Sequence, residues 1–229
     1  MNILNVISIP FYEFSADEDL TNEVFADIKK LKFDVPNTGN KTSYANDFYY
    51  HSKLFDFFEA CLLELKNKLQ LEKNVELTIV SCWANKNSKL EYHHYHHHPN
   101  SIISGIFYLT THESGNTVFA LPDPWYEILS NPNMTLSTNT GAGYEDLLPQ
   151  VSGKIKPVRG KLVLFPSHIK HKVLPLLSNE DRYTIAFNTF VSGIFNSNNH
   201  SIYLNLKAKS VRETFEEKIS LDKNNDQQT

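Results

Sequence analysis

The feature that most constrains the fold is a change in sequence pattern at about Val75. From there onward the chain consists of short β-rich runs separated by turn residues, which is typical of a β-sandwich or a barrel. We predict strands at 76–84, 90–96, 102–111, 116–121, 152–157, 161–165, 170–176, 182–191 and 201–206. The larger part of the chain is therefore predicted to be an all-β unit.

Before Val75 the pattern is helical. A first helix is predicted to begin at a Ser15 cap. Apolar residues follow that cap at helical spacing, namely Leu20, Val24, Ile28 and Leu31. A second helix is predicted from His51 to about Gln70, where the apolar residues form one broad stripe. We expect both helices to pack against one sheet of a mainly β fold, a double-stranded β-helix or jelly roll.

This pattern predicts a single domain over residues 1–229. Its parts are a helical N-terminal part at 1–72, a jelly-roll core at 73–206 and a polar C-terminal tail at 207–229. The segment 124–151 interrupts the succession of strands, and a loop of that length is usually functional or disordered. Its aromatic residues would cover a substrate or pack on the barrel wall: Trp125, Tyr126 and Tyr144.

Composition narrows the class of protein. The formal net charge is −4, whereas a nucleic-acid-binding protein is expected to carry a basic stripe. Cys61 and Cys82 are the only cysteines, too few for a disulfide framework, so a reduced, cytoplasmic setting is expected. The short apolar N-terminus lacks the features of a signal peptide. We also find no run of about 18 apolar residues, so no membrane span is predicted.

A cluster at 93–98 holds five of the ten histidines. Its position in mid-chain argues against an affinity tag, which leaves a solvated polar loop or a metal site. Because residues two apart in a strand share a face, His94, His96 and His98 should lie on one side and His93 and His97 on the other. Two imidazoles from His96-x-His98 can converge on one ion, and imidazole suits iron, copper, zinc and nickel alike.

A second group of polar residues lies downstream. After the apolar strand 161–165 and a turn, His171 opens the next strand, and Arg182 and Thr184 follow on another. These last two residues are two apart, so both can face the barrel interior. A buried guanidinium needs a partner, either a structural carboxylate or the carboxylate of a ligand, which its planar fork matches. Thr184 and Tyr108 would add hydroxyl groups beside it.

Several blocks together resemble the 2-oxoglutarate/Fe(II) dioxygenases, in particular oxygenases of phages and bacteria. The blocks are Trp83-Ala-Asn, His96-His-His-Pro-Asn-Ser-Ile-Ile-Ser-Gly-Ile-Phe-Tyr-Leu, Asp123-Pro, Gly160-Lys-Leu-Val-Leu-Phe-Pro-Ser, His171-Lys-Val-Leu-Pro and Arg182-Tyr-Thr-Ile-Ala-Phe-Asn. The downstream half is also similar to prolyl hydroxylases. A phage-encoded protein of this kind would act in the host cytoplasm.

The resemblance implies a jelly roll that binds Fe(II), 2-oxoglutarate and O₂. The far carboxylate of 2-oxoglutarate would lie on Arg182, Thr184 and Tyr108, and its oxidative decarboxylation would be coupled to hydroxylation of a substrate. Peptidyl proline or a small molecule would be the substrate by analogy with prolyl hydroxylases. The sequence indicates no oligomeric state.

The chain departs from the wider family at one ligand. Where the family has His-x-Asp or His-x-Glu, this chain has His96-x-His98. The metal set is therefore expected to be His96, His98 and His171, with Asp123 as an alternative ligand or as a residue that orients one. A cupin-type metal enzyme without 2-oxoglutarate would not need Arg182 and Thr184. A non-catalytic jelly-roll binding module would need no metal.

Overall fold

The computed structural model describes residues 9–33, 35–37, 40–42, 49–120, 152–195, 202–204 and 206. The helices are α1 (Glu18–Ile28) and α2 (Ser52–Lys68). The strands are β1 (Tyr12–Ser15), β2 (Val35–Asn37), β3 (Asn40–Thr42), β4 (Val75–Asn87), β5 (His93–His96), β6 (Ile103–Tyr108), β7 (Thr117–Ala120), β8 (Ser152–Ile155), β9 (Lys161–Pro166), β10 (Lys170–Val173), β11 (Arg182–Phe195) and β12 (Ile202–Leu204).

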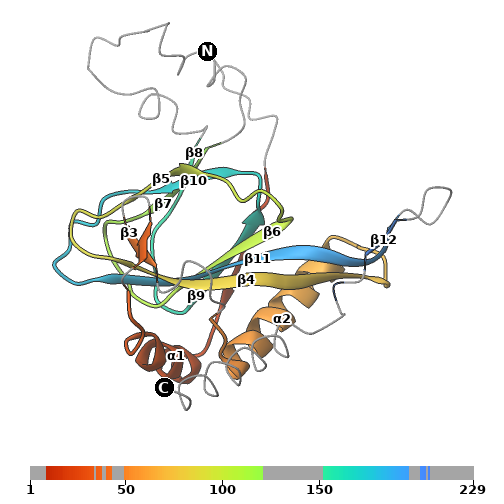
Figure 1. Cartoon of the computed structure of the whole chain (residues 1–229), viewed down its shortest axis with the longest axis horizontal. Helices are drawn as coiled ribbons and strands as arrows, with labels where there is room; N and C mark the ends of the chain where they lie inside the picture. Colours follow the sequence, from red (N-terminus) through yellow and green to blue (C-terminus); the bar gives the residue numbers. More distant parts are fainter. Residues whose placement is uncertain are drawn as a thin grey trace, which may run out of the picture.

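These strands form two antiparallel sheets that face each other (Figure 1). The larger sheet has eight strands in the order β1-β9-β6-β11-β4-β3-β2, with β12 paired to β11. The smaller sheet has four, in the order β5-β10-β7-β8. Two facing antiparallel sheets with helices on one outer face are the arrangement predicted from the sequence.

The middle strands β6 and β9 of the larger sheet are buried on both faces, and alternation along the strands explains how. On β9, Leu162 and Leu164 join the core shared with the helices, whereas Val163 and Phe165 join the core between the sheets. Because successive side chains point to opposite faces, a continuous apolar strand serves both cores. This is why β9 carries an unbroken apolar run from Leu162 to Phe165, and why every residue of β6 is buried.

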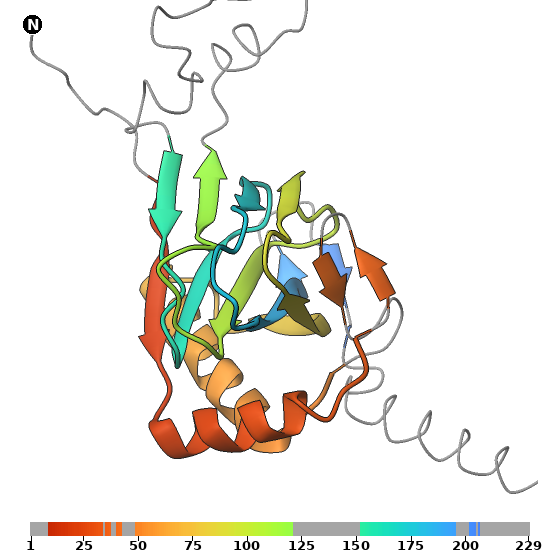
Figure 2. The same cartoon turned by 90° about the vertical axis from the view of Figure 1, so that its left-hand side faces the viewer.

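The two helices cover the outer face of the larger sheet (Figure 2). Phe58 of α2 is fully buried, and its ring centroid lies 5.8 Å from that of Phe107 on β6 and 4.5 Å from that of Phe187 on β11. The predicted cap of the first helix was wrong. Asp17 is the cap, because its side chain accepts from the Leu20 backbone N–H, while Ser15 ends β1.

All nine predicted strands are present, with ends shifted by a few residues. The sequence did not predict β1, β2 and β3, which have only three or four residues and gain their strand character from pairing. β1 lies along β9, with Tyr12 opposite Leu164, so the N-terminal part contributes an edge strand to the core sheet. Cys61 and Cys82 are free and buried in the helix-side core.

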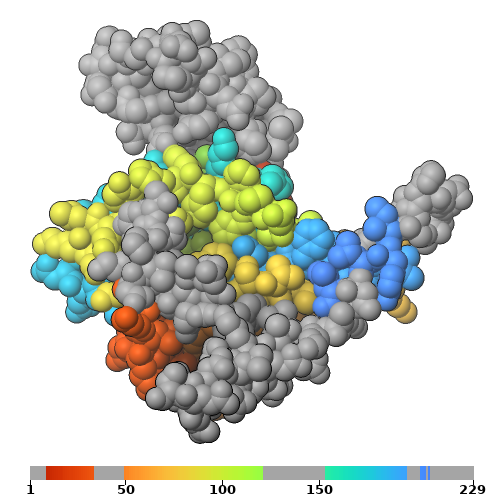
Figure 3. Space-filling model, in the orientation of Figure 1, coloured from red at the N-terminus to blue at the C-terminus, as the bar shows by residue number. Residues whose placement is uncertain are grey.

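β12 and the adjoining end of β11 extend away from the body of the molecule (Figure 3). Within the described ranges, no helix is both long and apolar enough to cross a membrane. The predicted loop 124–151 and tail 207–229 lie outside the described residues.

Candidate active site

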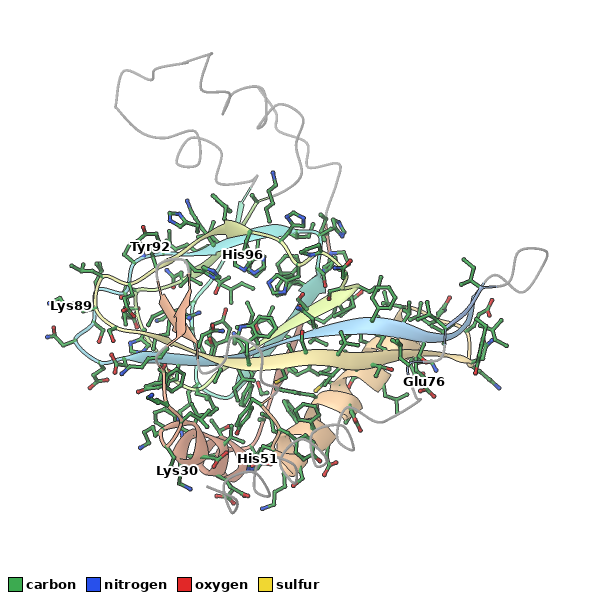
Figure 4. All side chains as sticks on the ribbon, in the orientation of Figure 1. Lys30, His51, Glu76, Lys89, Tyr92 and His96 are labelled. Carbon is green, nitrogen blue, oxygen red and sulfur yellow. The ribbon has the colours of Figure 1, made fainter. Side chains whose placement is uncertain are left out.

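Two histidines lie side by side on the smaller sheet. His96 on β5 is the direct cross-strand partner of His171 on β10, which in turn lies opposite Phe119 on β7. Direct partners point to the same face of a sheet. Phe119 belongs to the core between the sheets, so both imidazoles face the barrel interior. Figure 4 shows His96 beneath the smaller sheet, toward the larger one.

A third histidine joins them from the segment after β5. The His98 backbone N–H donates to the carbonyl oxygen of Ser167, 3.0 Å away, which fixes this segment next to the turn before β10. The His98 ring centroid lies 5.2 Å from that of His96 and 5.0 Å from that of His171. One nitrogen from each of the three rings lies within 4.8 Å of the others. We call these residues the three-histidine cluster.

Hydrogen bonds fix the tautomer of all three rings. Nδ1 of His96 lies 2.9 Å from the carbonyl oxygen of His94, and Nδ1 of His171 lies 3.1 Å from that of Ile169. Nδ1 of His98 lies 2.5 Å from Oδ1 of Asn188 on β11. These oxygens only accept, so each Nδ1 carries the proton and each Nε2 keeps a free lone pair.

Burial also keeps the three rings uncharged. Desolvation lowers the pKa of His98 to about 4, lowers that of His96, and lowers that of His171 well below its ordinary value. The neighbouring imidazoles also lower the pKa of His98 and of His171. Neutral imidazole is the form that binds metals. Three such nitrogens fit a first-row transition ion, including Fe(II), with coordination positions left for other ligands.

The second part of the site surrounds Arg182, the first residue of β11. Its side chain is fully buried, with Nη1 donating to Asn87 Oδ1 at 3.1 Å and Nη2 to Thr117 Oγ1 at 3.4 Å. The guanidinium lies over the Tyr108 ring, 5.4 Å from its centroid. Among the residues that the structure describes, no carboxylate forms an ion pair with Arg182. Arg182 Nε and Asn87 Nδ2 are buried there without a hydrogen-bond partner.

Two hydroxyl residues predicted to stand beside Arg182 are adjacent to it in the fold. Thr184 is buried and lies directly opposite Tyr108 on β6. The Tyr108 hydroxyl lies 2.9 Å from Thr117 Oγ1, which also accepts from Arg182. Burial lowers the pKa of Arg182 and raises that of Tyr108. This end of the interior therefore presents a cation and neutral hydroxyl groups.

The sequence prediction for His93 was wrong. Strict alternation put it on the face opposite His96, but β5 contains an irregularity against β10 that places His93 opposite Val173. Asn87, Thr117 and Asn188 were also missed. The sequence did contain a signal for Asn188, because it continues the series of alternate residues on one face of the strand that begins with Arg182 and Thr184. The sequence contains no signal for the bulge in β5.

Other predicted residues are not in the described part of the chain. Asp123, the alternative metal ligand, and the tentative substrate residues Trp125 and Tyr126 all lie outside the described residues.

Comparison with known proteins identifies the class of enzyme. Residues 81–188, which contain the three-histidine cluster, Arg182 and Asn188, match the family model of the 2OG-Fe(II) oxygenases. The core of this chain is a 2OG-Fe(II) oxygenase domain. The protein is accordingly an oxidoreductase that depends on Fe(II) and 2-oxoglutarate. No curated protein sequence matches the chain.

Solved structures support the fold of this oxygenase. A prolyl-4-hydroxylase from Pseudomonas putida aligns with a TM-score of 0.53 and 15% identity, covering 79% of this chain and 93% of the other. HygX from Streptomyces hygroscopicus, with nickel and 2-oxoglutarate bound, aligns with a TM-score of 0.54 and 10% identity, covering 79% and 82%. A prolyl hydroxylase from Trichoplax adhaerens, in complex with a hypoxia inducible factor peptide fragment, aligns with a TM-score of 0.51 and 16% identity, covering 79% and 83%. At these identities the likeness establishes the jelly-roll fold, as predicted.

Proposed function

We propose that this oxygenase holds Fe(II) through Nε2 of His96, His98 and His171 and binds the far carboxylate of 2-oxoglutarate at Arg182. The observation that carries the proposal is the guanidinium of Arg182, which is fully buried and has no carboxylate partner among the described residues. A buried charge without a counter-charge costs several kcal/mol. A carboxylate supplied by a ligand would offset that cost through charge-assisted hydrogen bonds.

The residues around Arg182 would orient that carboxylate. Thr117 and Asn87 hold two nitrogens of the guanidinium in place, and Thr184 and Tyr108 would add hydroxyl donors. The three-histidine cluster would bind the metal through neutral imidazoles whose tautomers are already fixed. When bound, Fe(II) and 2-oxoglutarate would supply the oxidising chemistry, in which the substrate C–H, O₂ and 2-oxoglutarate are converted to the hydroxylated substrate, CO₂ and succinate.

The substrate is proposed to be a peptide, with prolyl residues favoured, or a small molecule. Both classes occur among the similar structures, since the Trichoplax enzyme has a peptide fragment bound and HygX has been solved with hygromycin B. We further propose that the described strands and helices form one oxygenase domain, because β1 pairs with β9 and both helices contribute to the helix-side core.

The test is binding of 2-oxoglutarate to the Ni(II)-loaded protein, measured by calorimetry and by thermal shift. We expect metal-dependent binding in the wild type and a loss of about 100-fold in affinity in Arg182→Gln, because a charged bidentate contact is removed. Arg159→Ala is the matched control, since Arg159 instead contacts Leu109 and Asn22. Unchanged affinity in Arg182→Gln would contradict the assignment of the carboxylate site.

The choice between His98 and Asp123 as third ligand needs its own variants. We expect His98→Ala to lower metal affinity at least as much as His96→Ala, and Asp123→Asn to leave it within a few fold. The reverse result would make Asp123 the ligand. Release of succinate under Fe(II) and O₂, screened with prolyl peptides and small molecules, then identifies the substrate.

A further inference from the structure

His93 lies on the interior face of the barrel although alternation predicts the opposite. His171 on β10 pairs with His96 on β5, and Val173 pairs with His93. The two paired positions are two residues apart on β10 but three residues apart on β5. This extra residue is a β-bulge, which re-aims a side chain. Val173 also pairs with Thr117, whose hydroxyl contacts Arg182 in the interior, so the row His93, Val173 and Thr117 shares that face.

The imidazole of His93 lies beside the three-histidine cluster, since its ring centroid lies 4.1 Å from that of His96. It also belongs to the row with Val173 and Thr117, and the Thr117 hydroxyl accepts from Arg182. His93 thus lies beside the proposed metal site, in the row of side chains that leads to the proposed carboxylate site.

The contacts of the described residues show no other role for the His93 ring. His93 is absent from the group of nitrogens that lie within 4.8 Å of one another, so the three-histidine cluster is complete without it. None of the described residues forms a hydrogen bond with His93, although its three cluster neighbours each have a defined acceptor. A neutral imidazole always carries one N–H, and a carboxylate is a strong acceptor for it.

We propose that His93 is a positioning residue for 2-oxoglutarate and donates its ring N–H to a carboxylate oxygen of the bound cosubstrate. The inference rests on the proposed function, because it assumes that 2-oxoglutarate spans from the three-histidine cluster to Arg182. It adds a residue on β5, from the smaller sheet, to a binding site whose other proposed donors, Arg182, Thr184 and Tyr108, come from the larger sheet.

The experiment separates a hydrogen-bonding role from a packing role. Ni(II)-loaded wild type, His93→Phe and His93→Gln are titrated with 2-oxoglutarate by calorimetry, and metal affinity is measured separately for each protein. Phe keeps an aromatic ring against His96 but has no donor, whereas Gln restores an N–H donor. His94→Ala is the matched control, because His94 is the neighbouring histidine on β5 and its side chain is exposed.

We expect His93→Phe to weaken 2-oxoglutarate binding about tenfold or more, as for one hydrogen bond to a charged group. The metal affinity of His93→Phe should stay within about twofold of the wild-type value. His93→Gln should recover a large part of the lost 2-oxoglutarate affinity. If His93→Phe binds 2-oxoglutarate as tightly as the wild type, or loses metal binding in parallel, the proposed role of His93 is overturned while the proposed function stands. Absence of 2-oxoglutarate binding in the wild type would overturn the proposed function as well, so the two failures are distinguishable.

Discussion

At the scale of single residues, the site depends on neutral hydrogen-bond acceptors. Two backbone carbonyls and the amide of Asn188 each hold one imidazole of the three-histidine cluster. With three neutral ligands, a bound Fe(II) would keep its full 2+ charge, whereas the carboxylate usual in the wider family would reduce it. Groups that accept a hydrogen bond from a metal-binding imidazole orient that ring and affect how strongly it binds the metal.

Asn188 provides the most direct test of this arrangement. Its Oδ1 accepts from His98 Nδ1 and from the Ser104 hydroxyl, 2.8 Å away. We expect Asn188→Leu to lower metal affinity about 10-fold to 100-fold, because His98 loses the acceptor that fixes its ring. Competition titration of Ni(II) with a chromophoric chelator measures the change. Asn188→Asp retains an acceptor and should bind metal at least as tightly as the wild type; equal losses in both variants would argue against an orienting role.

At the scale of elements, the larger sheet contributes side chains to two cores, one on each of its faces. Alternate residues of β6, β9 and β11 pack against the helices, and the remaining ones line the site. Gly105 on β6 illustrates how tightly the helix side is filled, since a Cβ there would lie 2.3 Å from the Phe187 ring. The helices therefore support the strands that carry Tyr108, Arg182 and Asn188 without contributing a site residue.

Phe58 tests the contribution of α2. Replacing this fully buried ring with alanine removes its contacts with Phe107 and Phe187 and leaves a cavity. We expect the free energy of unfolding to fall by about 3–5 kcal/mol. Denaturant titration followed by circular dichroism gives the value. Leu63→Ala, on the exposed side of the same helix, should change it by less than about 0.5 kcal/mol; similar losses in both would mean that α2 is not anchored through Phe58.

At the scale of the whole molecule, the proposed ligands would join the two sheets. His96 and His171 lie on the smaller sheet, Arg182 lies on the larger one, and His98 is tied to the larger sheet through Asn188. Metal and 2-oxoglutarate would therefore bind only the assembled barrel. Ligands that bind the native state alone stabilise it by mass action.

Removal of the metal should accordingly lower thermal stability. With Ni(II) at about 100 times its Kd, bound metal adds about 2.7 kcal/mol, so a chelator should lower the melting temperature by several degrees. Differential scanning calorimetry with and without EDTA measures this shift. In His171→Ala the same comparison should show little or no shift; an equal shift there would place the stabilising metal elsewhere.

The sequence by itself determined most of the element order and the main polar groups of the site. The turn-bounded β-rich runs located nine strands, and helical spacing located α1 and α2. These signals are local, because they depend on residues a few positions apart. Local spacing also indicated His96, His98, Arg182 and Thr184, and the family resemblance added His171. The fold brings these five residues to the barrel interior.

Only the tertiary structure decided the face of His93 and the partners of the other site residues. The bulge in β5 exists because of its pairing with β10, and alternation within β5 gives no sign of it. Asn87 and Thr117 reach Arg182 across 95 and 65 residues of sequence, and Asn188 reaches His98 across 90. Such contacts depend on strand register and on the packing of one sheet over the other, which no short stretch of sequence encodes.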